Sequence, residues 1–492
     1  MTVEKKKTGI KNALAWSFLQ RCSQQGLRFF LTLIMVRLLT PDDYGLLGMV
    51  IIFGALSKKL VDAGFSSALV QKKDITDADC QTAFYTNLAF SLVIYVALFC
   101  GAPYIAEFYS QLILTSLVRF TGLGVITGAL SAIQAVLYTR NLDFKTPTRL
   151  SVISMVVGGV TGITCAWYGL GVWSLAIQAF VTGTLKCAMF WALGNFRPRL
   201  VYSMDSLSKL FSFGSRVSFL SIVETSFQHL HEVVIGRMFA PAVLGLYGRG
   251  KSLMDFGMMN VVQPLNLVIY PAMSRVQESA RDLTNLHLRA LRLLGFLITP
   301  TMVFLACAAP SLVEALLTAK WLGCVPYLRM MCMIGALVPL RKACTTALKA
   351  TNNLNDAIRL QLMSRATSLA VLAVSHRFGI LAMIFGEAMT LAVFSLVYFR
   401  KVAARTETTV REQVTAICSC VIPAALAALV VLGVQSYVNT NPYVELVTYF
   451  AVGATVYLGV CHWMGNESLA QGVSFARELR ANRLRRLENQ VV

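Results

Sequence analysis

The side chains best suited to binding chemistry form a cationic face near the amino terminus. Ser17, Arg21, Gln25, Arg28 and Thr32 recur at steps of three and four residues, which places them on one face of a helix. Charged groups at membrane depth are costly, so they normally face a water-filled cavity or one another and mark a transport path. We therefore predict that Arg21, Gln25 and Arg28 bind an anionic substrate in such a cavity.

A second polar face occurs 200 residues further along the chain. Its members are Ser221, Glu224, Thr225, Gln228 and Glu232, so the polar pattern is repeated while its charge changes from positive to negative. We predict that Glu224, Gln228 and Glu232 line the same cavity or couple transport to a cation. A buried salt-bridge network between the arginines and Glu224 is the alternative. Helix periodicity does not separate the two, because a cavity also needs its charges balanced.

Further charged residues are candidates outside these two faces. Arg249 and Lys251 open a polar span and are predicted to bind the anion, with snorkelling of their long side chains to the interface as the alternative. Asp62 ends an apolar segment, either as a counter-charge or as a polar cap, and Arg216 either guards the inner mouth or snorkels. For Glu387, isolated in another apolar segment, an interhelical pair or a helix-end position is the favoured account.

Several kinds of chemistry lack their sequence motifs. The chain has no Gly-x-x-x-x-Gly-Lys-Ser/Thr phosphate loop, no His-Glu-x-x-His and no Gly-x-Ser-x-Gly, so neither ATP hydrolysis nor these hydrolytic reactions are encoded. His229 and His231 point apart on a helix, which argues against a metal site. The sequence predicts a transporter and not an enzyme, with no catalytic residue, metal or cofactor.

The composition indicates which elements position these charges. Hydrophobic residues make up 56% of the chain and charged residues 14%, against about 25% charged in soluble domains. The apolar stretches are about twenty residues long, which a helix needs to cross a bilayer. The sequence predicts an all-α integral membrane protein of about fourteen transmembrane helices. The spans are placed at about 11–37, 44–66, 81–104, 112–138, 147–168, 171–194, 208–236, 243–271, 287–309, 322–348, 356–375, 379–400, 412–434 and 443–464.

An internal repeat predicts how the spans are grouped. The segment Arg37-Leu-Leu-Thr-Pro41-Asp-Asp-Tyr-Gly45 aligns without a gap on Arg237-Met-Phe-Ala-Pro241-Ala-Val-Leu-Gly245. Six spans separate the two copies, so both run in the same direction. This pattern predicts two six-helix lobes related by a parallel repeat, with the substrate site between them, and two additional C-terminal helices. The predicted domains are residues 1–200 (spans 1–6), 201–405 (spans 7–12), 406–466 (spans 13 and 14) and 467–492, a basic cytoplasmic tail.

Positive charge gathers on one side of the predicted membrane. Clusters such as Lys72 with Lys73, and Arg341 with Lys342, alternate with opposite connections such as 102–111 and 435–443 that contain no Lys or Arg. The positive side of a membrane protein is cytoplasmic, so both termini are predicted to be cytoplasmic. The net charge of +20 follows from this topology, and no nucleic-acid partner is expected.

Four motifs spread over the chain carry a family resemblance. They are the segment from Arg37 to Met49 after span 1, Asp62-Ala-Gly-Phe-Ser-Ser-Ala-Leu-Val-Gln71 at the end of span 2, Tyr247-Gly-Arg249 in span 8, and Tyr270-Pro271-Ala-Met-Ser274 at its end. With these motifs the chain resembles the polysaccharide-export flippases of the multidrug/oligosaccharidyl-lipid/polysaccharide (MOP) superfamily. The resemblance is to their WzxC-like branch, which contains colanic acid exporters and lipopolysaccharide biosynthesis proteins.

The resemblance implies a function and a substrate. Such a protein moves an undecaprenyl-diphosphate-linked oligosaccharide across the bacterial inner membrane by alternating access, for lipopolysaccharide, capsule or exopolysaccharide biosynthesis. It implies that a cationic central cavity holds the diphosphate with Arg21, Arg28 and Arg249. The implied partners are this lipid-linked glycan, membrane lipids, a polysaccharide polymerase and chain-length proteins.

Two other functions remain open. A multidrug or cation antiporter of the same superfamily would share the architecture, but it should have a carboxylate-rich cavity, against which Arg21 and Arg28 argue. A membrane glycan polymerase or ligase is expected to carry a large outer loop for its acceptor, whereas the outer connections of this sequence are short.

Overall fold

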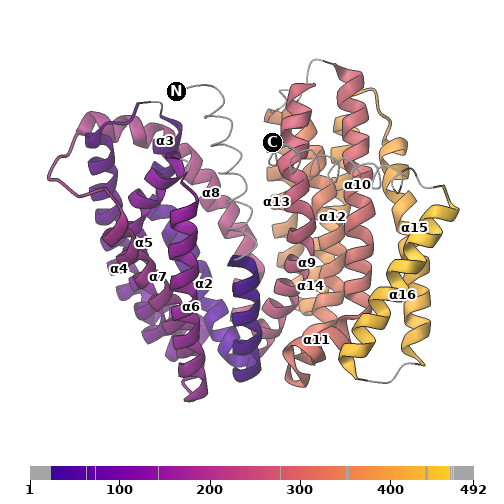
Figure 1. Ribbon diagram of the computed structural model, residues 1–492, viewed down its shortest axis with the longest axis horizontal. Coiled ribbons are helices and arrows are strands. Elements are labelled where there is room, and N and C mark those ends of the chain that lie inside the picture. Colours follow the sequence, from indigo (N-terminus) through magenta and orange to yellow (C-terminus); the bar gives the residue numbers. More distant parts are fainter. Residues whose placement is uncertain are drawn as a thin grey trace, which may run out of the picture. The chain divides into compact units, whose positions relative to one another are not determined.

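The fold consists of helices joined by short connections. The computed structural model describes residues 24–62, 64–72, 74–141, 143–276, 279–350, 354–437, 441–465, 467 and 469. No strand occurs within these ranges. The chain divides into two compact units, residues 1–245 (unit 1) and residues 246–492 (unit 2); Figure 1 colours their helices along the sequence. The lobe boundaries expected from the repeat stay a prediction.

Unit 1 is built mainly from long helices. Residues 24–38 are helical. The helices that follow are α2 (Pro41–Asp62), α3 (Phe65–Gln71), α4 (Asp77–Tyr109), α5 (Ile113–Arg140), α6 (Lys145–Trp167), α7 (Val172–Leu193) and α8 (Met204–Met238). α4 starts with a reciprocal cap, in which Thr76 Oγ1 accepts from Asp79 N at 3.2 Å and Asp79 Oδ2 accepts from Thr76 N at 2.9 Å. Such a cap satisfies two backbone donors that the first turn leaves unpaired.

Unit 2 repeats this construction with additional short helices. It contains most of α9 (Pro241–Arg275), then α10 (Ala280–Cys307), α11 (Ala309–Leu317), η1 (Ala319–Cys324), α12 (Val325–Ala350), α13 (Leu354–Ser375), η2 (His376–Phe378), α14 (Ile380–Ala403), α15 (Val410–Gln435) and α16 (Pro442–Trp463). The hydropathy pattern did not predict α11 and η1, because a search for stretches of about twenty apolar residues passes over helices that are too short to cross a bilayer.

The described helices confirm a multi-pass helical membrane protein. Eleven of them are long and apolar enough to cross a membrane, and each coincides with a predicted span. α8 and α9 also coincide with predicted spans and have 35 residues each, but they carry many polar side chains and are not among the eleven. The first predicted span is only partly described. The count of fourteen therefore stays a prediction.

The two copies of the Pro-x-x-x-Gly repeat meet inside unit 1. A Cβ atom added to Gly45 would lie 1.8 Å from the Pro241 carbonyl oxygen, and one added to Gly245 would lie 1.9 Å from the Pro41 carbonyl oxygen. No side chain tolerates such distances. The glycines of the repeat therefore allow the first turns of α2 and α9 to approach each other backbone to backbone, which is a structural reason for both copies.

Buried polar side chains hold the connector between α7 and α8 (residues 194–203). Gln81, at the start of α4, donates to the Arg197 carbonyl at 3.0 Å and accepts from the Arg199 N–H at 2.9 Å. Thr82 and Gln134 hold two further backbone groups of this connector, at 3.1 Å and 2.9 Å. Because Gln81, Thr82 and Gln134 are all buried, their hydrogen bonds fix where α8 begins.

A comparable arrangement holds the connector between α14 and α15 (residues 404–409). Thr284, at the start of α10, accepts from Glu407 N at 3.0 Å. Gln413 donates to the Phe399 carbonyl at 3.0 Å, and its other amide atom lies 3.2 Å from Nε2 of the buried His287. The end of α14 and the start of α15 are thereby fixed against α10 in unit 2.

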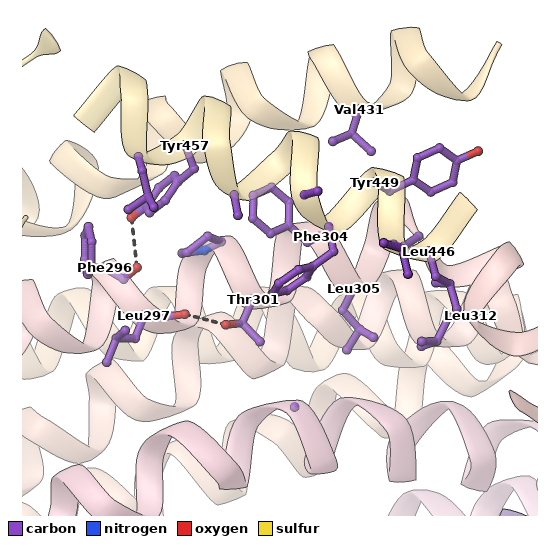
Figure 2. A pocket seen from close by; sticks show the side chains of 18 residues that line it. Phe296, Leu297, Thr301, Phe304, Leu305, Leu312, Val431, Leu446, Tyr449 and Tyr457 are labelled. Carbon is purple, nitrogen blue, oxygen red and sulfur yellow. Dashed lines mark hydrogen bonds between the residues drawn. The ribbon is translucent and has the colours of Figure 1, made fainter. Parts of the chain in front are cut away.

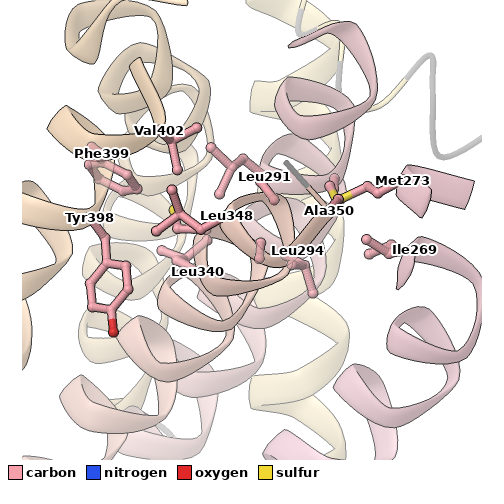
Figure 3. Packing of buried hydrophobic residues seen from close by; sticks show 14 of the residues in the cluster. Ile269, Met273, Leu291, Leu294, Leu340, Leu348, Ala350, Tyr398, Phe399 and Val402 are labelled. Carbon is pink, nitrogen blue, oxygen red and sulfur yellow. The ribbon is translucent and has the colours of Figure 1, made fainter. Parts of the chain in front are cut away.

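A large apolar core of unit 2 lies around these helices. It joins side chains of α9, α10, α12, α13 and α14, and Figure 3 shows part of it. Tyr398 lies at its border: the ring belongs to the core, while the hydroxyl points away from the other labelled side chains. A buried phenol hydroxyl needs a polar partner, so polar groups are expected on that side of the core.

Candidate functional site

The first polar face is described from residue 24 onward. Arg21 lies outside the described residues. Gln25 is half-buried and Arg28 is exposed, whereas Met35 is almost fully buried. Arg28 and Met35 are seven residues apart and share one helix face. That face is therefore covered by neighbouring helices at Met35 and open at Arg28.

A close contact with α6 explains the change along this face. A Cβ atom added to Gly159 would lie 2.4 Å from a terminal carbon of Leu31, so the glycine provides the space that Leu31 fills. Leu31 is buried. Five residues earlier, Gly26 has open space where its Cβ would be. Packing is thus tight from Leu31 toward the end of the helix and loose around Arg28, which leaves the guanidinium accessible.

The second polar face is divided between two environments. Glu224 and Gln228 are exposed on α8, but Thr225 is buried and donates to the Ser221 carbonyl at 2.7 Å. α8 packs against α2 and α3, and a Cβ on Gly64, in the turn between those two helices, would lie 2.2 Å from the Gly214 carbonyl oxygen. The predicted polar face is therefore not uniform: Glu224 and Gln228 are exposed, whereas Thr225 beside them is buried.

Glu232 is engaged locally. Its Oε2 lies 2.6 Å from Nδ1 of His229, and both side chains are half-buried. The buried Tyr109 is close enough to interact electrostatically with Glu232. In the part of the chain that the structure describes, Arg28 and Glu224 form no ion pair with each other. The salt-bridge alternative therefore receives no support from Arg28.

In unit 2, Arg249 and Lys251 lie about two turns inside α9. Both are half-buried. Between them, Gly250 faces the start of α12, where an added Cβ would lie 3.2 Å from Leu328 N. Arg249 also interacts electrostatically with the buried Cys324 of η1. These contacts place Arg249 against protein.

Asp62 has a local capping role. Its Oδ1 accepts hydrogen bonds from Ser66 N at 3.2 Å and from Ser66 Oγ at 2.5 Å. Gly64, with φ of 78°, makes the turn between α2 and α3 that permits this cap. Of the two interpretations of Asp62, these bonds favour the polar cap. Arg216 belongs to α8, and its side chain is outside the described set.

An apolar cavity of about 720 Å³ lies in unit 2. Figure 2 shows Phe296, Phe304 and Leu312 on one side of it and residues of α15 and α16, such as Leu446 and Tyr449, on the other. The few polar atoms are already used, since Tyr457 donates to the Phe296 carbonyl at 3.0 Å. The lining is suited to hydrocarbon. The sequence gave no signal for it, because cavity-lining and lipid-facing apolar side chains look alike.

Comparisons with solved structures show which known fold the chain shares. A lipid II flippase, MurJ, in an inward closed conformation has a TM-score of 0.70 and 12% sequence identity, over 95% of this chain and 99% of that one. An inward-facing multidrug resistance MATE transporter of the MOP superfamily has a TM-score of 0.59 and 14% identity, over 78% and 96% of the two chains. The protein therefore has the fold of the MOP superfamily transporters, which confirms the predicted fold class.

The sequence comparisons identify the family. A family model described as polysaccharide biosynthesis protein matches residues 34–326. This is more than half of the chain, so the protein belongs to that family and the predicted resemblance is confirmed. Among named relatives, lipopolysaccharide biosynthesis protein WzxC of Escherichia coli (strain K12) is 22% identical over 328 residues, covering 65% of this chain and 66% of WzxC.

Two more relatives carry names that refer to other polymers. Succinoglycan biosynthesis transport protein ExoT of Rhizobium meliloti (strain 1021) is 24% identical over 68% of this chain and 67% of its own length. Teichuronic acid biosynthesis protein TuaB of Bacillus subtilis (strain 168) is 22% identical over 56% and 58%. The match thus spans about two thirds or less of each relative. ExoT is named as a transport protein and MurJ as a flippase, which agrees with the predicted transporter.

Proposed function

We propose that this protein is a flippase that moves a lipid-linked oligosaccharide from the inner to the outer leaflet of a bacterial inner membrane. The product would be used to build lipopolysaccharide, capsule or exopolysaccharide. The observation that carries this proposal is the polysaccharide biosynthesis family match combined with the fold of a lipid II flippase. Both termini are proposed to be cytoplasmic, on the side where Lys and Arg concentrate.

The proposed substrate headgroup is an undecaprenyl-linked diphosphate. Arg28 is its first proposed contact, because it is an accessible guanidinium on a helix face that is otherwise packed. Arg21 and Gln25 belong to the same predicted face, and Arg249 and Lys251 would contribute from α9. Arginine suits a diphosphate because its planar donors pair with phosphate oxygens and keep their charge away from bulk water.

The proposed mechanism is alternating access, in which the site opens to one side of the membrane at a time. Glu224 and Gln228 are accessible and would either contact sugar hydroxyls or compete for the arginines when the site is empty. Glu232 is proposed to act in coupling together with His229, whose Nδ1 lies 2.6 Å from the Glu232 Oε2. Arg216 is proposed at the inner mouth. A polysaccharide polymerase and chain-length proteins are proposed partners after translocation.

A second candidate is a multidrug or cation antiporter, which the fold similarity to a MATE transporter favours. The two functions differ in the charge of their substrates. A cation antiporter would use its carboxylates to bind cargo, whereas the proposed flippase uses guanidinium groups. Neutralising Glu224 therefore abolishes antiport but leaves most flipping intact.

The experiment is deletion and complementation in the producing bacterium. For the flippase, deletion lowers surface glycan and causes the lipid-linked intermediate to accumulate on the inner leaflet, and the wild-type gene reverses both. Intact surface glycan with altered drug sensitivity would reject the flippase in favour of the antiporter. Membrane abundance of each expressed variant is measured by immunoblotting as the control.

A further inference from the structure

A second group of charged side chains lies inside unit 2, away from the polar faces described above. Arg341 of α12 donates through Nη1 to Ser364 Oγ of α13 at 3.3 Å. Arg341 also interacts electrostatically with Arg365 of α13 and Glu387 of α14. Arg365 and Glu387 thus lie within electrostatic range of the Arg341 guanidinium, each on a different neighbouring helix.

This group lies deep within the helices. Arg341 is about 14 Å from the end of α12 at Ala350, and Arg365 is about 17 Å from the start of α13 at Leu354, at 1.5 Å per residue. Arg341, which the charge pattern groups with Lys342 on the cytoplasmic side, belongs to a membrane-capable helix. Charged residues in membrane-spanning helices mark functional sites by default, because the membrane interior penalises them.

The charges of the group do not balance. Apart from Glu387, the sequences of α12, α13 and α14 contain one acidic residue, Asp356. Asp356 lies near the start of α13, 3.7 Å from both Lys401 and Arg405. Two arginines beside one glutamate leave an excess positive charge, and like charges in a low-dielectric interior repel each other unless an anion joins them.

Hydroxyl groups complete the arrangement. Ser364 is almost fully buried, and so is Tyr398. Tyr398 lies within electrostatic range of Arg341 and Arg365, and its hydroxyl interacts with the Thr345 side chain. That hydroxyl points away from the apolar core in Figure 3. Guanidinium and hydroxyl groups are donors that bind phosphate oxygens.

We propose that Arg341, Arg365, Ser364 and Tyr398 form an oxyanion-binding site of the phosphate class inside unit 2, with Glu387 as a competing counter-charge. When the site is empty, Glu387 offsets one arginine. When a phosphate group binds, it takes over the guanidinium donors that Glu387 otherwise attracts. The oxyanion is either part of a lipid headgroup or a free phosphate. The proposal does not depend on the proposed flippase function, since it concerns binding alone.

The test is titration of inorganic diphosphate onto the full-length protein in phosphatidylcholine nanodiscs, with Kd as the readout. Arg365→Gln should raise Kd roughly tenfold, the effect of one charge-assisted hydrogen bond. Glu387→Gln should lower Kd by several fold, because the competing carboxylate is removed. Lys342→Gln is the matched control: Lys342 is the exposed neighbour of Arg341, and its Kd should equal that of the wild type.

A purely structural ion pair predicts a different outcome. Both substitutions would then lower the unfolding temperature while leaving Kd at the wild-type value, which overturns the proposal. If Arg365→Gln does not insert, Arg365→Lys replaces it and should still weaken binding, because lysine cannot bind two oxygens in parallel. Complete loss of diphosphate binding in Arg28→Gln would also overturn the proposal, since the only site would then be on the first helix.

The same titration identifies the source of the oxyanion. Phosphatidylglycerol added to the nanodisc raises the apparent Kd for diphosphate if phospholipid headgroups occupy the site. Farnesyl diphosphate binds more tightly than inorganic diphosphate if a lipid-linked diphosphate is the ligand. Equal affinities without lipid competition indicate free phosphate. Each of these results retains the site, and each requires that Arg365→Gln weakens the binding.

Discussion

The two units use polar side chains near the start of α4 and α10 in the same way. In unit 1, Thr76 caps α4 and Gln81, five residues later, holds the connector before α8. In unit 2, Ser279 caps α10 and Thr284, again five residues later, holds the connector before α15. In both cases the connector follows the last of six predicted spans and is held by the third of those six, which is α4 for spans 1–6 and α10 for spans 7–12.

The units differ in where their functional charges lie. The proposed charges of unit 1, Arg28 and Glu224, are exposed on their helices. In unit 2, Arg341, Arg365 and Glu387 are half-buried and close to one another. The repeat thus preserves features that hold the helices together, while the charged groups are particular to each unit. Residues that hold the fold together are thus distinct from the charged residues that are proposed to bind substrate.

The largest effect is expected where the two copies of the repeat meet. Gly45→Ala and Gly245→Ala each force a Cβ into a backbone carbonyl, which should cost about 3 kcal/mol or more by overpacking. Both variants should show low membrane abundance and a lower unfolding temperature in a thermal-shift assay. Gly248→Ala is the control, because its Cβ has open space. A loss in only one of the two glycine variants would break the proposed equivalence of the copies.

The next effect is expected at Gln413. Its removal as Gln413→Ala leaves the Phe399 carbonyl and a side of the buried His287 without their hydrogen bonds, which should cost about 2 kcal/mol. The measurement is the unfolding temperature of the purified protein. Gln361→Ala, on an exposed part of α13, should leave it unchanged. Equal temperatures for the two variants would show that the unit 2 connector is not held by this network.

A smaller loss of stability is expected at Gln81, because much of the connector it holds is exposed and water can replace the lost bonds. Gln81→Ala should cost about 1 kcal/mol. Its clearer readout is limited trypsin digestion, since release of the connector should speed cleavage after Arg199. Unchanged cleavage together with wild-type stability would show that Gln81 does not hold the α7–α8 connector. The two connectors would then not be held in the same way.

The smallest effect is expected at a surface pair. Lys209 and Asp205 lie 2.5 Å apart on α8, with side chains 64% and 73% exposed. Lys209→Gln should change the free energy of unfolding by less than about 0.5 kcal/mol, because exposed ion pairs are screened by water and salt. A loss of stability as large as that of Gln413→Ala would show that an exposed ion pair can hold the fold together. Burial would then not distinguish structural residues from residues proposed to bind substrate.

The sequence predicted the fold class and most of the helices because apolar length is a strong signal. It predicted the environments of polar residues less well. Glu224 and Thr225 are neighbours on one predicted stripe, yet Glu224 is exposed and Thr225 buried. Helical spacing gives the direction of a side chain but not which helix, if any, lies opposite.

The same limit explains the missed residues. Gln81 and His287 are polar residues of membrane-capable helices, yet their role is to hold backbone and amide groups that only the folded chain brings near. Arg365 is a candidate binding residue only because Arg341 and Glu387 lie on neighbouring helices. Such contacts join residues far apart in the chain, and no local pattern encodes them.

The most direct test of the flippase account is export by Arg28 variants in the deletion strain. Arg28→Ala and Arg28→Lys should insert at wild-type abundance, since Arg28 is exposed. Arg28→Ala should abolish surface glycan and accumulate the lipid-linked intermediate, and Arg28→Lys should restore only part of the export because lysine binds phosphate without the paired donors of arginine. Normal export by a fully inserted Arg28→Ala protein would contradict the cationic site at the centre of this account.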